Sequence, residues 1–365
     1  MSQQPLADWR LAERLGWAVG SSGLPDVAPS EVAVLRADLG VTVARADAVA
    51  REVTGLGAGL DPAGARVIGR RAWIRDNLAA MAHLTDPVAD RLVRTSGLAR
   101  SVARRGIAVQ LGVVFGYLST KVLGQYEVFH PEAEAGGRPG PGRLTLVGPN
   151  LVELERTVLP GSGVSPAELR MGLCLHEVAH RLQFEGVPWL RPRLRAIVDG
   201  YLGEARLEPE QVREAAGAAR RLLADPSRLT DRESLLAVVL TPTQRRLFDE
   251  AQSLMSLLEG HGNVVMDWGA EVIAARDGLE VDPGRVRGVL NRRRQQATDQ
   301  ALRKLLGLGL KAQQYRLGER FIFGVAERHG REAFDRVWQD PANVPSRAEL
   351  DDPDAWVARV AAGRG

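Results

Sequence analysis

Two histidines and a glutamate stand close together in the segment HEVAH, residues 176–180. On a helix, residues four apart share one face, so His176 and His180 can aim their imidazoles at one point. Neutral imidazole nitrogens are common ligands of zinc. Glu177 is rotated to the side of that face, where its carboxylate can reach a metal-held water without binding the ion. The spacing therefore predicts Zn²⁺ held by His176 and His180, with Glu177 as general base.

The chain around this motif carries the start and stop signals of one helix. Ser165 and Glu168 can form a capping box, Pro166 suits the first helical position, and Gly186 followed by Pro188 ends the helix. The chain has six histidines among 365 residues, so the chance that this motif occurs in it by accident is below about one in a hundred. Two ordinary histidines, solvated or hydrogen-bonded in a core, are the alternative interpretation.

A catalytic zinc site needs a third protein ligand from elsewhere in the chain. A third histidine within an extended motif would require glycine at position 183 and histidine at 186, where this chain has Gln183 and Gly186. We therefore expect the ligand on a second helix. Glu259 is the preferred candidate, because its apolar neighbours would make an unpaired carboxylate costly to bury. Pairing of Glu259 with an arginine, and ligation by Glu204 instead, are the alternatives.

Three further side chains are candidates for roles beside the ligands. His261 follows Glu259 by two positions, about 200° around a regular helix, so both face one ion only if the glycine-flanked backbone departs from helix. His261 is expected to be a ligand, a hydrogen-bond donor to the transition state or a polar cap. Tyr315 is expected to be an oxyanion donor or a packed tyrosine. Asn263 is placed to steady Glu259.

Other conspicuous residues favour structural roles. The arginines at 191, 193 and 195, and those at 292–294, have no aromatic residues between them and are expected to form solvated faces rather than phosphate or nucleic-acid sites. Cys174, the single cysteine, is expected to be a small buried apolar residue in the motif helix.

Composition and charge are those of an ordinary globular chain, with 48 basic and 45 acidic residues, 45% apolar residues and a net charge of +3. Collagen-like, disordered and disulfide-stapled classes are excluded. Interspersed charges give no reason to expect a nucleic-acid partner. The longest uncharged apolar stretch, residues 106–120, is shorter than the roughly 20 residues that span a bilayer. One cysteine and the absence of a signal-peptide pattern predict a cytoplasmic protein without a membrane partner, and oligomeric state is left open.

Helical signals dominate the chain, which predicts a mainly α fold with at most a small β-sheet. A long helix is expected to open at Pro29 and to close before Gly55. A short strand is expected within residues 143–150, and its residues 144–147 are expected to pair with an extended substrate. Further helical segments are expected at residues 66–84, 87–105 and 107–129.

A segment rich in glycine and proline, residues 135–142, is the best candidate for a domain boundary. It divides the chain into an N-terminal helical region, residues 1–134, and a metal-binding catalytic region, residues 135–365. One continuous domain is the alternative.

Several segments together resemble a known family: residues 175–190 and 254–263, with 116–119, 122–126, 314–318, 334–338 and 345–349. The family is the actinobacterial zincin-like family, whose members are named zinc-dependent metalloprotease or hydrolase, and some deazaflavin-coenzyme-biosynthesis-associated protein. The resemblance implies a mainly helical zincin-like fold with His176 and His180 as ligands, Glu177 as base and Glu259 as third ligand. It implies no substrate.

Motif and resemblance together predict a zinc-dependent hydrolase, a metallopeptidase of gluzincin type acting on a peptide or protein substrate. Glu177 would take a proton from the attacking water and return it to the leaving amine. The alternative is a non-catalytic zinc-containing scaffold or partner protein associated with deazaflavin cofactor biosynthesis. A purely structural zinc site has no use for Glu177, and we therefore favour the hydrolase.

Overall fold

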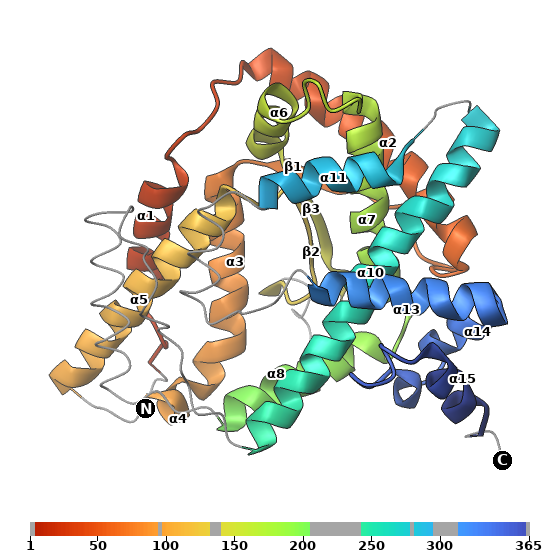
Figure 1. Ribbon diagram of the computed structural model, residues 1–365. Helices are drawn as coiled ribbons and strands as arrows, with labels where there is room; N and C mark the ends of the chain where they lie inside the picture. The colour runs from red at the N-terminus through yellow and green to blue at the C-terminus, as the bar shows by residue number, and fades with distance from the viewer. Residues whose placement is uncertain are drawn as a thin grey trace.

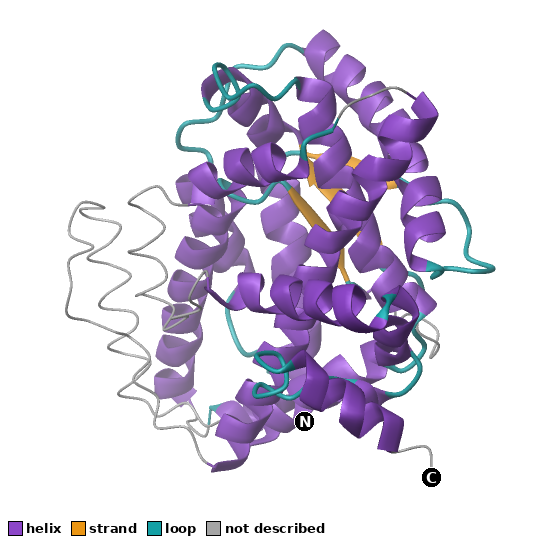
Figure 2. Ribbon diagram, turned by 45° about the vertical axis from the view of Figure 1, so that its right-hand side comes forward, coloured by secondary structure: helices purple, strands orange, loops and turns teal. Residues whose placement is uncertain are grey.

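The structure, a computed structural model, describes residues 4–93, 97–131, 140–204, 242–277, 281–294 and 313–362. Within these ranges helices surround a small central sheet (Figures 1 and 2), which confirms the mainly α prediction. The helices are α1 (Trp9–Gly20), α2 (Pro29–Thr54), α3 (Arg70–Thr85), α4 (Ala89–Leu92), α5 (Gly97–Ser119), α6 (Gly148–Thr157), α7 (Pro166–Gly186), α8 (Leu190–Glu204), α10 (Pro242–Asp277), α11 (Pro283–Arg294), α13 (Gln313–His329), α14 (Arg331–Asp335) and α15 (Pro353–Ala362). Short 3₁₀ turns are η1 (Asp86–Val88), η4 (Arg336–Trp338) and η5 (Pro341–Asn343).

The sheet consists of β1 (Ala65–Ile68), β2 (Gly124–Glu127) and β3 (Arg143–Val147), in the order β1-β3-β2. β1 runs parallel to β3, and β2 runs antiparallel to it. The predicted strand at β3 is confirmed. Its predicted pairing with a substrate is wrong, because β3 is the central strand and its two neighbours occupy both of its edges. β2 is an edge strand of this sheet.

Two strands lie where helices were predicted. β1 begins at Ala65 and β2 at Gly124, inside or beside the segments 66–84 and 107–129. Each has only four residues, too few for the alternation of apolar and polar side chains that identifies a strand. The predicted break near residue 106 is also wrong, since α5 runs without interruption through that position.

The sheet also bears on domain organisation. β1 and β2 precede residue 134 and β3 follows residue 135, so one sheet contains strands from both sides of the predicted boundary. The sheet thus joins residues from both sides of the boundary, and the division into domains stays a prediction. Most of the boundary segment, residues 132–139, lies outside the described residues. Among the described helices, none is both long and apolar enough to cross a membrane.

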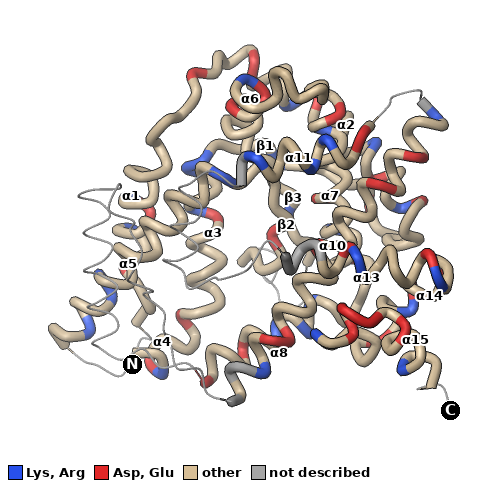
Figure 3. Tube along the Cα trace, viewed as in Figure 1, with Lys and Arg blue, Asp and Glu red and all other residues tan. Residues whose placement is uncertain are grey.

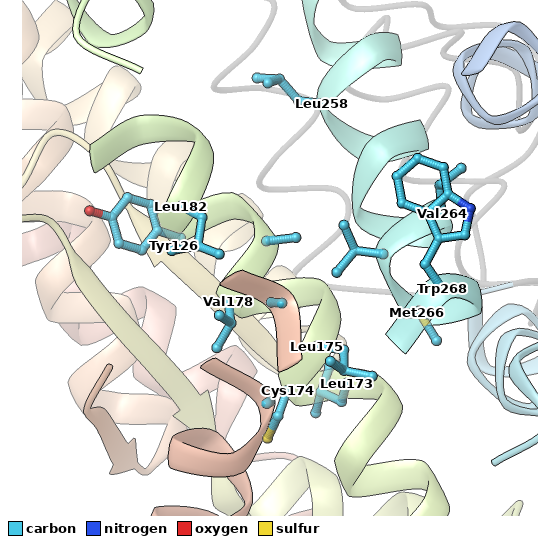
Figure 4. Close-up of a cluster of buried hydrophobic side chains, with 14 of the residues drawn as sticks. Tyr126, Leu173, Cys174, Leu175, Val178, Leu182, Leu258, Val264, Met266 and Trp268 are labelled. Atoms are coloured by element: carbon cyan, nitrogen blue, oxygen red, sulfur yellow. The ribbon is translucent and has the colours of Figure 1, made fainter. Parts of the chain in front are cut away.

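The main hydrophobic core forms around α7, which packs against α2, α10 and β2. Figure 4 shows Leu175, Val178 and Leu182 of α7, with Leu182 next to Tyr126 of β2 and with Val264 and Trp268 of α10 across from α7. Each of these α7 residues is fully buried, and burial of such a side chain contributes roughly 1.5–3 kcal/mol. Cys174 is also fully buried, as predicted, and burial raises the pKa of its thiol. The motif helix is therefore held rigidly from several sides.

A second core joins α1, α3 and α5 on the other side of the sheet (Figure 1). α1 and α5 approach closely because glycines face each other across their contact. A Cβ atom at Gly116 would lie 2.5 Å from the carbonyl oxygen of Gly16 and 2.8 Å from Cβ of Val19. Backbone atoms cannot yield as a flexible side chain can, so this contact requires glycine.

We expect Gly116→Ala to lower the free energy of unfolding by about 1–3 kcal/mol through overpacking of the contact between α1 and α5. Gly40→Ala in α2 is the matched control, because a Cβ there meets nothing within 4 Å. That variant should gain about 0.5–1 kcal/mol from the better helix propensity of alanine. Urea unfolding of both variants measures the two changes. A neutral Gly116→Ala would contradict the close contact.

Candidate metal centre

Local sequence signals position the motif on α7. The Ser165 hydroxyl accepts a hydrogen bond from the Glu168 backbone N–H at 3.2 Å, and the Glu168 carboxylate accepts one from the Ser165 N–H at 2.7 Å. Pro166 takes the first helical position, and the helix ends at Gly186 before the extended Val187. The capped helix predicted from the sequence is confirmed, from the residue that begins it to the residue that ends it.

The structure brings together the three predicted metal ligands. The Nε2 atoms of His176 and His180 lie 3.1 Å apart. Glu259, from α10, places one carboxylate oxygen 3.4 Å from Nε2 of His176 and the other 3.9 Å from Nε2 of His180. All three offered ligand atoms lie within 4.8 Å of one another, and no other such group of histidine, cysteine or acidic residues occurs among the described residues.

These separations fit a zinc ion. Zinc–nitrogen bonds of about 2.1 Å at a tetrahedral angle put two ligand nitrogens roughly 3.4 Å apart. The observed 3.1 Å between the histidine nitrogens is close to that value, and so is the 3.4 Å from nitrogen to carboxylate. Two imidazoles and one carboxylate are also the donor set of a catalytic zinc site, which leaves one coordination position open.

Glu177 lies between α7 and the edge strand β2. Its side chain is buried, with 7% of its surface exposed. A Cβ atom at Gly124 of β2 would come within 2.8 Å of the Glu177 carboxylate, so glycine lets the strand backbone lie directly against this group. The carboxylate thus packs against a neighbouring main chain, on the residue that follows the candidate ligand His176, and the Gly124 contact was not predicted.

The Gln183 side chain orients His180. Its amide nitrogen donates to the Leu258 carbonyl at 3.1 Å, because a carbonyl can only accept. The amide oxygen therefore faces Nδ1 of His180 at 2.9 Å and must accept its proton. With Nδ1 protonated, Nε2 of His180 keeps the lone pair that a metal needs. Gln183 is fully buried and so holds this arrangement away from water.

His261 lies behind the ligands rather than among them. It is 1% exposed, its Nδ1 accepts from the Gln183 amide at 2.8 Å, and its ring packs on Phe334 and Trp338. Burial lowers the pKa of His261 to about 3, so the ring is neutral. Because α10 is continuous from Pro242 to Asp277, Glu259 and His261 face different directions, as a regular helix requires.

The glycines on either side of His261 allow other helices to approach α10. A Cβ at Gly262 would lie 2.8 Å from two ring atoms of His176, and a Cβ at Gly260 would lie 2.4 Å from the backbone of α13. They bring α10 against the metal ligands without a break in the helix. Asn263, expected to steady Glu259, instead donates to Glu319 of α13 at 3.3 Å.

Two further candidates can be placed only in part. Glu204 ends α8 as an exposed residue and does not belong to the ligand group. Tyr315 belongs to the first turn of α13, but its side chain lies outside the described residues. Gln183 entered the sequence argument only as a departure from another motif, and its spacing of three from His180 was the available signal.

Comparison with known proteins agrees with this geometry. The sequence profile of a family described as zincin-like metallopeptidase matches residues 7–357. Among solved structures, a crystal structure of a "putative hydrolase with a novel fold" from Chloroflexus aurantiacus is similar to this chain. The TM-score is 0.67 and the identity 26%, over 97% of this chain and 98% of that one. No curated protein matches the chain.

We expect Glu259→Gln to weaken zinc binding by more than about 100-fold, beyond the 10–100-fold typical of residues that only support a ligand. The change preserves shape and removes the negative charge that faces both histidines. Glu204→Gln is the control and should leave zinc affinity unchanged. Competition with a chromophoric chelator measures both. Equal affinities in the two variants would remove Glu259 from the ligand set.

We expect Gln183→Leu to weaken zinc binding by about 10–100-fold, because His180 loses the acceptor that fixes its ring. Gln125→Leu in β2 is the control: it removes hydrogen bonds to Trp73 and Asn77 of α3, and neither of these partners is a candidate ligand. Both variants should lose about 1–3 kcal/mol of stability, since each leaves buried partners unsatisfied. Only Gln183→Leu should change zinc affinity in the chelator assay, and a change in both variants would point to general loosening of the fold.

Proposed function

Since the chain belongs to the zincin-like metallopeptidase family, we propose that it is a zinc-dependent hydrolase of gluzincin type that cleaves peptide bonds. The observation that carries the proposal is the convergence of His176, His180 and Glu259 from two helices, with Glu177 next to the first ligand. The donor set is that of a catalytic zinc, and the adjoining carboxylate is the group that hydrolysis requires.

Each residue of the centre has a part in the proposed reaction. A bound zinc ion would lower the pKa of a water molecule and polarise the carbonyl of the scissile bond. Glu177 accepts the proton of the attacking water and donates it to the leaving nitrogen. Gln183 holds His180 in the required tautomer, and His261 positions Gln183. His261 is thus proposed as a positioning residue, since its buried ring bonds Gln183.

An extended substrate is proposed to pair with β2. This strand is at the edge of the sheet, and its Gly124 lies against the Glu177 carboxylate. Main-chain hydrogen bonding to a sheet edge is a common means of peptide recognition. A peptide added along β2 would pass beside the proposed base, which supports a peptide over a small amide as the substrate.

Two broader expectations accompany this proposal. A cytoplasmic location is supported by the single cysteine, which is buried and reduced. The actinobacterial and deazaflavin associations rest on the sequence resemblance alone and stay predictions.

We expect Glu177→Gln to reduce peptide cleavage by about 10²–10⁴-fold, because a glutamine cannot carry a proton from water to the leaving group. Zinc content should stay near one ion per chain, since Glu177 is not a ligand. Glu168→Gln, in the first turn of the same helix, is the control and should keep its activity. A peptide library read by mass spectrometry measures cleavage, and metal analysis measures zinc.

The result can overturn the proposal in two distinct ways. Zinc-loaded protein that cleaves no peptide in the library would support the non-catalytic scaffold. Protein without near-stoichiometric zinc under metal-replete conditions would reject the zinc site, and with it both functions.

A further inference from the structure

Arg191, the second residue of α8, is a buried arginine with unused donors. The sequence analysis expected a solvated arginine face here, and for Arg191 that is wrong: only 8% of its surface is exposed. Arg193, two positions on, is exposed and pairs with Glu250 at 2.6 Å. Arg191 donates from Nη1 to the Gly140 carbonyl, while its Nε and Nη2 atoms are buried without a hydrogen-bond partner.

Nε and Nη2 form the forked edge of a guanidinium, which fits the two oxygens of a carboxylate. Elsewhere the chain uses this edge in that way. Arg170 donates from Nε and Nη2 to the two oxygens of Glu155, each at 2.7 Å. Leaving such an edge buried and unpaired costs free energy. Arg191 is thus arranged for an acceptor that the described residues do not supply.

Arg191 is one of the residues that line a cavity of about 700 Å³ at the C-terminal end of α7. This volume is within the range of small-ligand sites. Apolar side chains line much of it, among them Leu60, Phe129, Leu144 and Phe184. None of the three metal ligands lines it. The cavity is therefore distinct from the candidate metal ligands, and it is a half-open site that offers an apolar body a place beside Arg191.

The charges of the cavity favour a ligand with a single negative charge. Arg181 lines it but pairs with Asp47 and Glu185, each at 3.1 Å. Arg195 also lines it and pairs with its own neighbour on α8. The unpaired guanidinium edge among these three arginines is that of Arg191. The carboxylates of Glu185 and Asp61, which also line the cavity, would repel a dianion. Figure 3 shows how basic and acidic positions mix around α8.

We propose that this cavity binds a carboxylate carried on an apolar or peptide body, with Nε and Nη2 of Arg191 as the anchor. Arg191 also stands in the first turn of α8, where the helix dipole favours an anion. The carboxylate belongs to a peptide C-terminus or to an acidic side chain, which share this chemistry. Binding requires neither the zinc nor Glu177, so the inference goes beyond the proposed hydrolysis.

The test uses the full zinc-loaded chain with Glu177→Gln, which prevents cleavage during binding. Three fluorescein-labelled hexapeptides of alanine and phenylalanine serve as probes: one with a free C-terminal carboxylate, one with a C-terminal amide, and one amide with a single internal glutamate. Fluorescence anisotropy gives their affinities. At least one carboxylate probe should bind about 10-fold or more tightly than the uncharged amide. Comparison of the two carboxylate probes shows whether the cavity prefers a peptide C-terminus or an acidic side chain.

Arg191→Lys, which keeps the charge and loses the fork, should abolish that preference. Arg193→Lys on the exposed face is the matched control and should preserve it. If Arg191→Lys lowers the melting temperature strongly, an NMR measurement on ¹⁵N-arginine-labelled protein takes the place of this variant. The Nε–H resonance of Arg191 should shift when a carboxylate probe is added and should not shift when the uncharged amide is added. Equal binding of acid and amide probes, an unmoved resonance, or a preference that survives Arg191→Lys would overturn the proposal. Zinc content and cleavage by the unmodified chain are independent of these outcomes.

Discussion

The candidate metal centre depends on one buried amide. Gln183 of α7 donates to the backbone of α10 at Leu258 and to the ring of His261, and it accepts from the ring of His180. A single side chain thereby fixes the tautomers of two histidines and the relative position of two helices. Every donor and acceptor of the amide is used, and for that reason a polar group can lie in an apolar core without a penalty. Glu259, the proposed third ligand, follows Leu258 directly and is placed by the same contact.

Close packing and hydrogen bonding support each other where α7 packs against α10. Gly260 and Gly262 have no side chains where α10 contacts α13 and His176. The helices can therefore approach closely enough for the Gln183 amide to reach Leu258 and His261. Gly124 does the same for β2 and Glu177. Around this polar group the buried leucines and valines of α7 and α10 exclude water, which strengthens the electrostatic interactions inside. Stability and chemical arrangement therefore come from the same contacts.

The parts that could be predicted from the sequence are local. The capping box, the four-residue spacing and the terminal glycine define α7 within the segment itself, and Glu259 is marked by its apolar neighbours. The strands β1 and β2 were missed because their four residues carry no period and gain stability only from pairing with β3. Gln183 was missed because two of its three partners, Leu258 and His261, lie far away in the sequence, and Gly124 was missed because it lies far from Glu177. Arg191 could not be told from its exposed neighbours, since its burial depends on the cavity wall contributed by other segments.

The parallel pairing of β1 with β3 has a consequence for how the molecule assembles. Ala65 pairs with Leu144, so about 80 residues of chain must be looped out before this ladder can close. Closure over that distance is slow compared with the formation of a single helix. His176 and His180 lie on one face as soon as α7 has formed. Glu177 contacts Gly124 only after β2 has paired with β3 in the sheet. The contact between Glu177 and Gly124 is therefore completed only with the tertiary packing of α7 against β2, later than α7 itself.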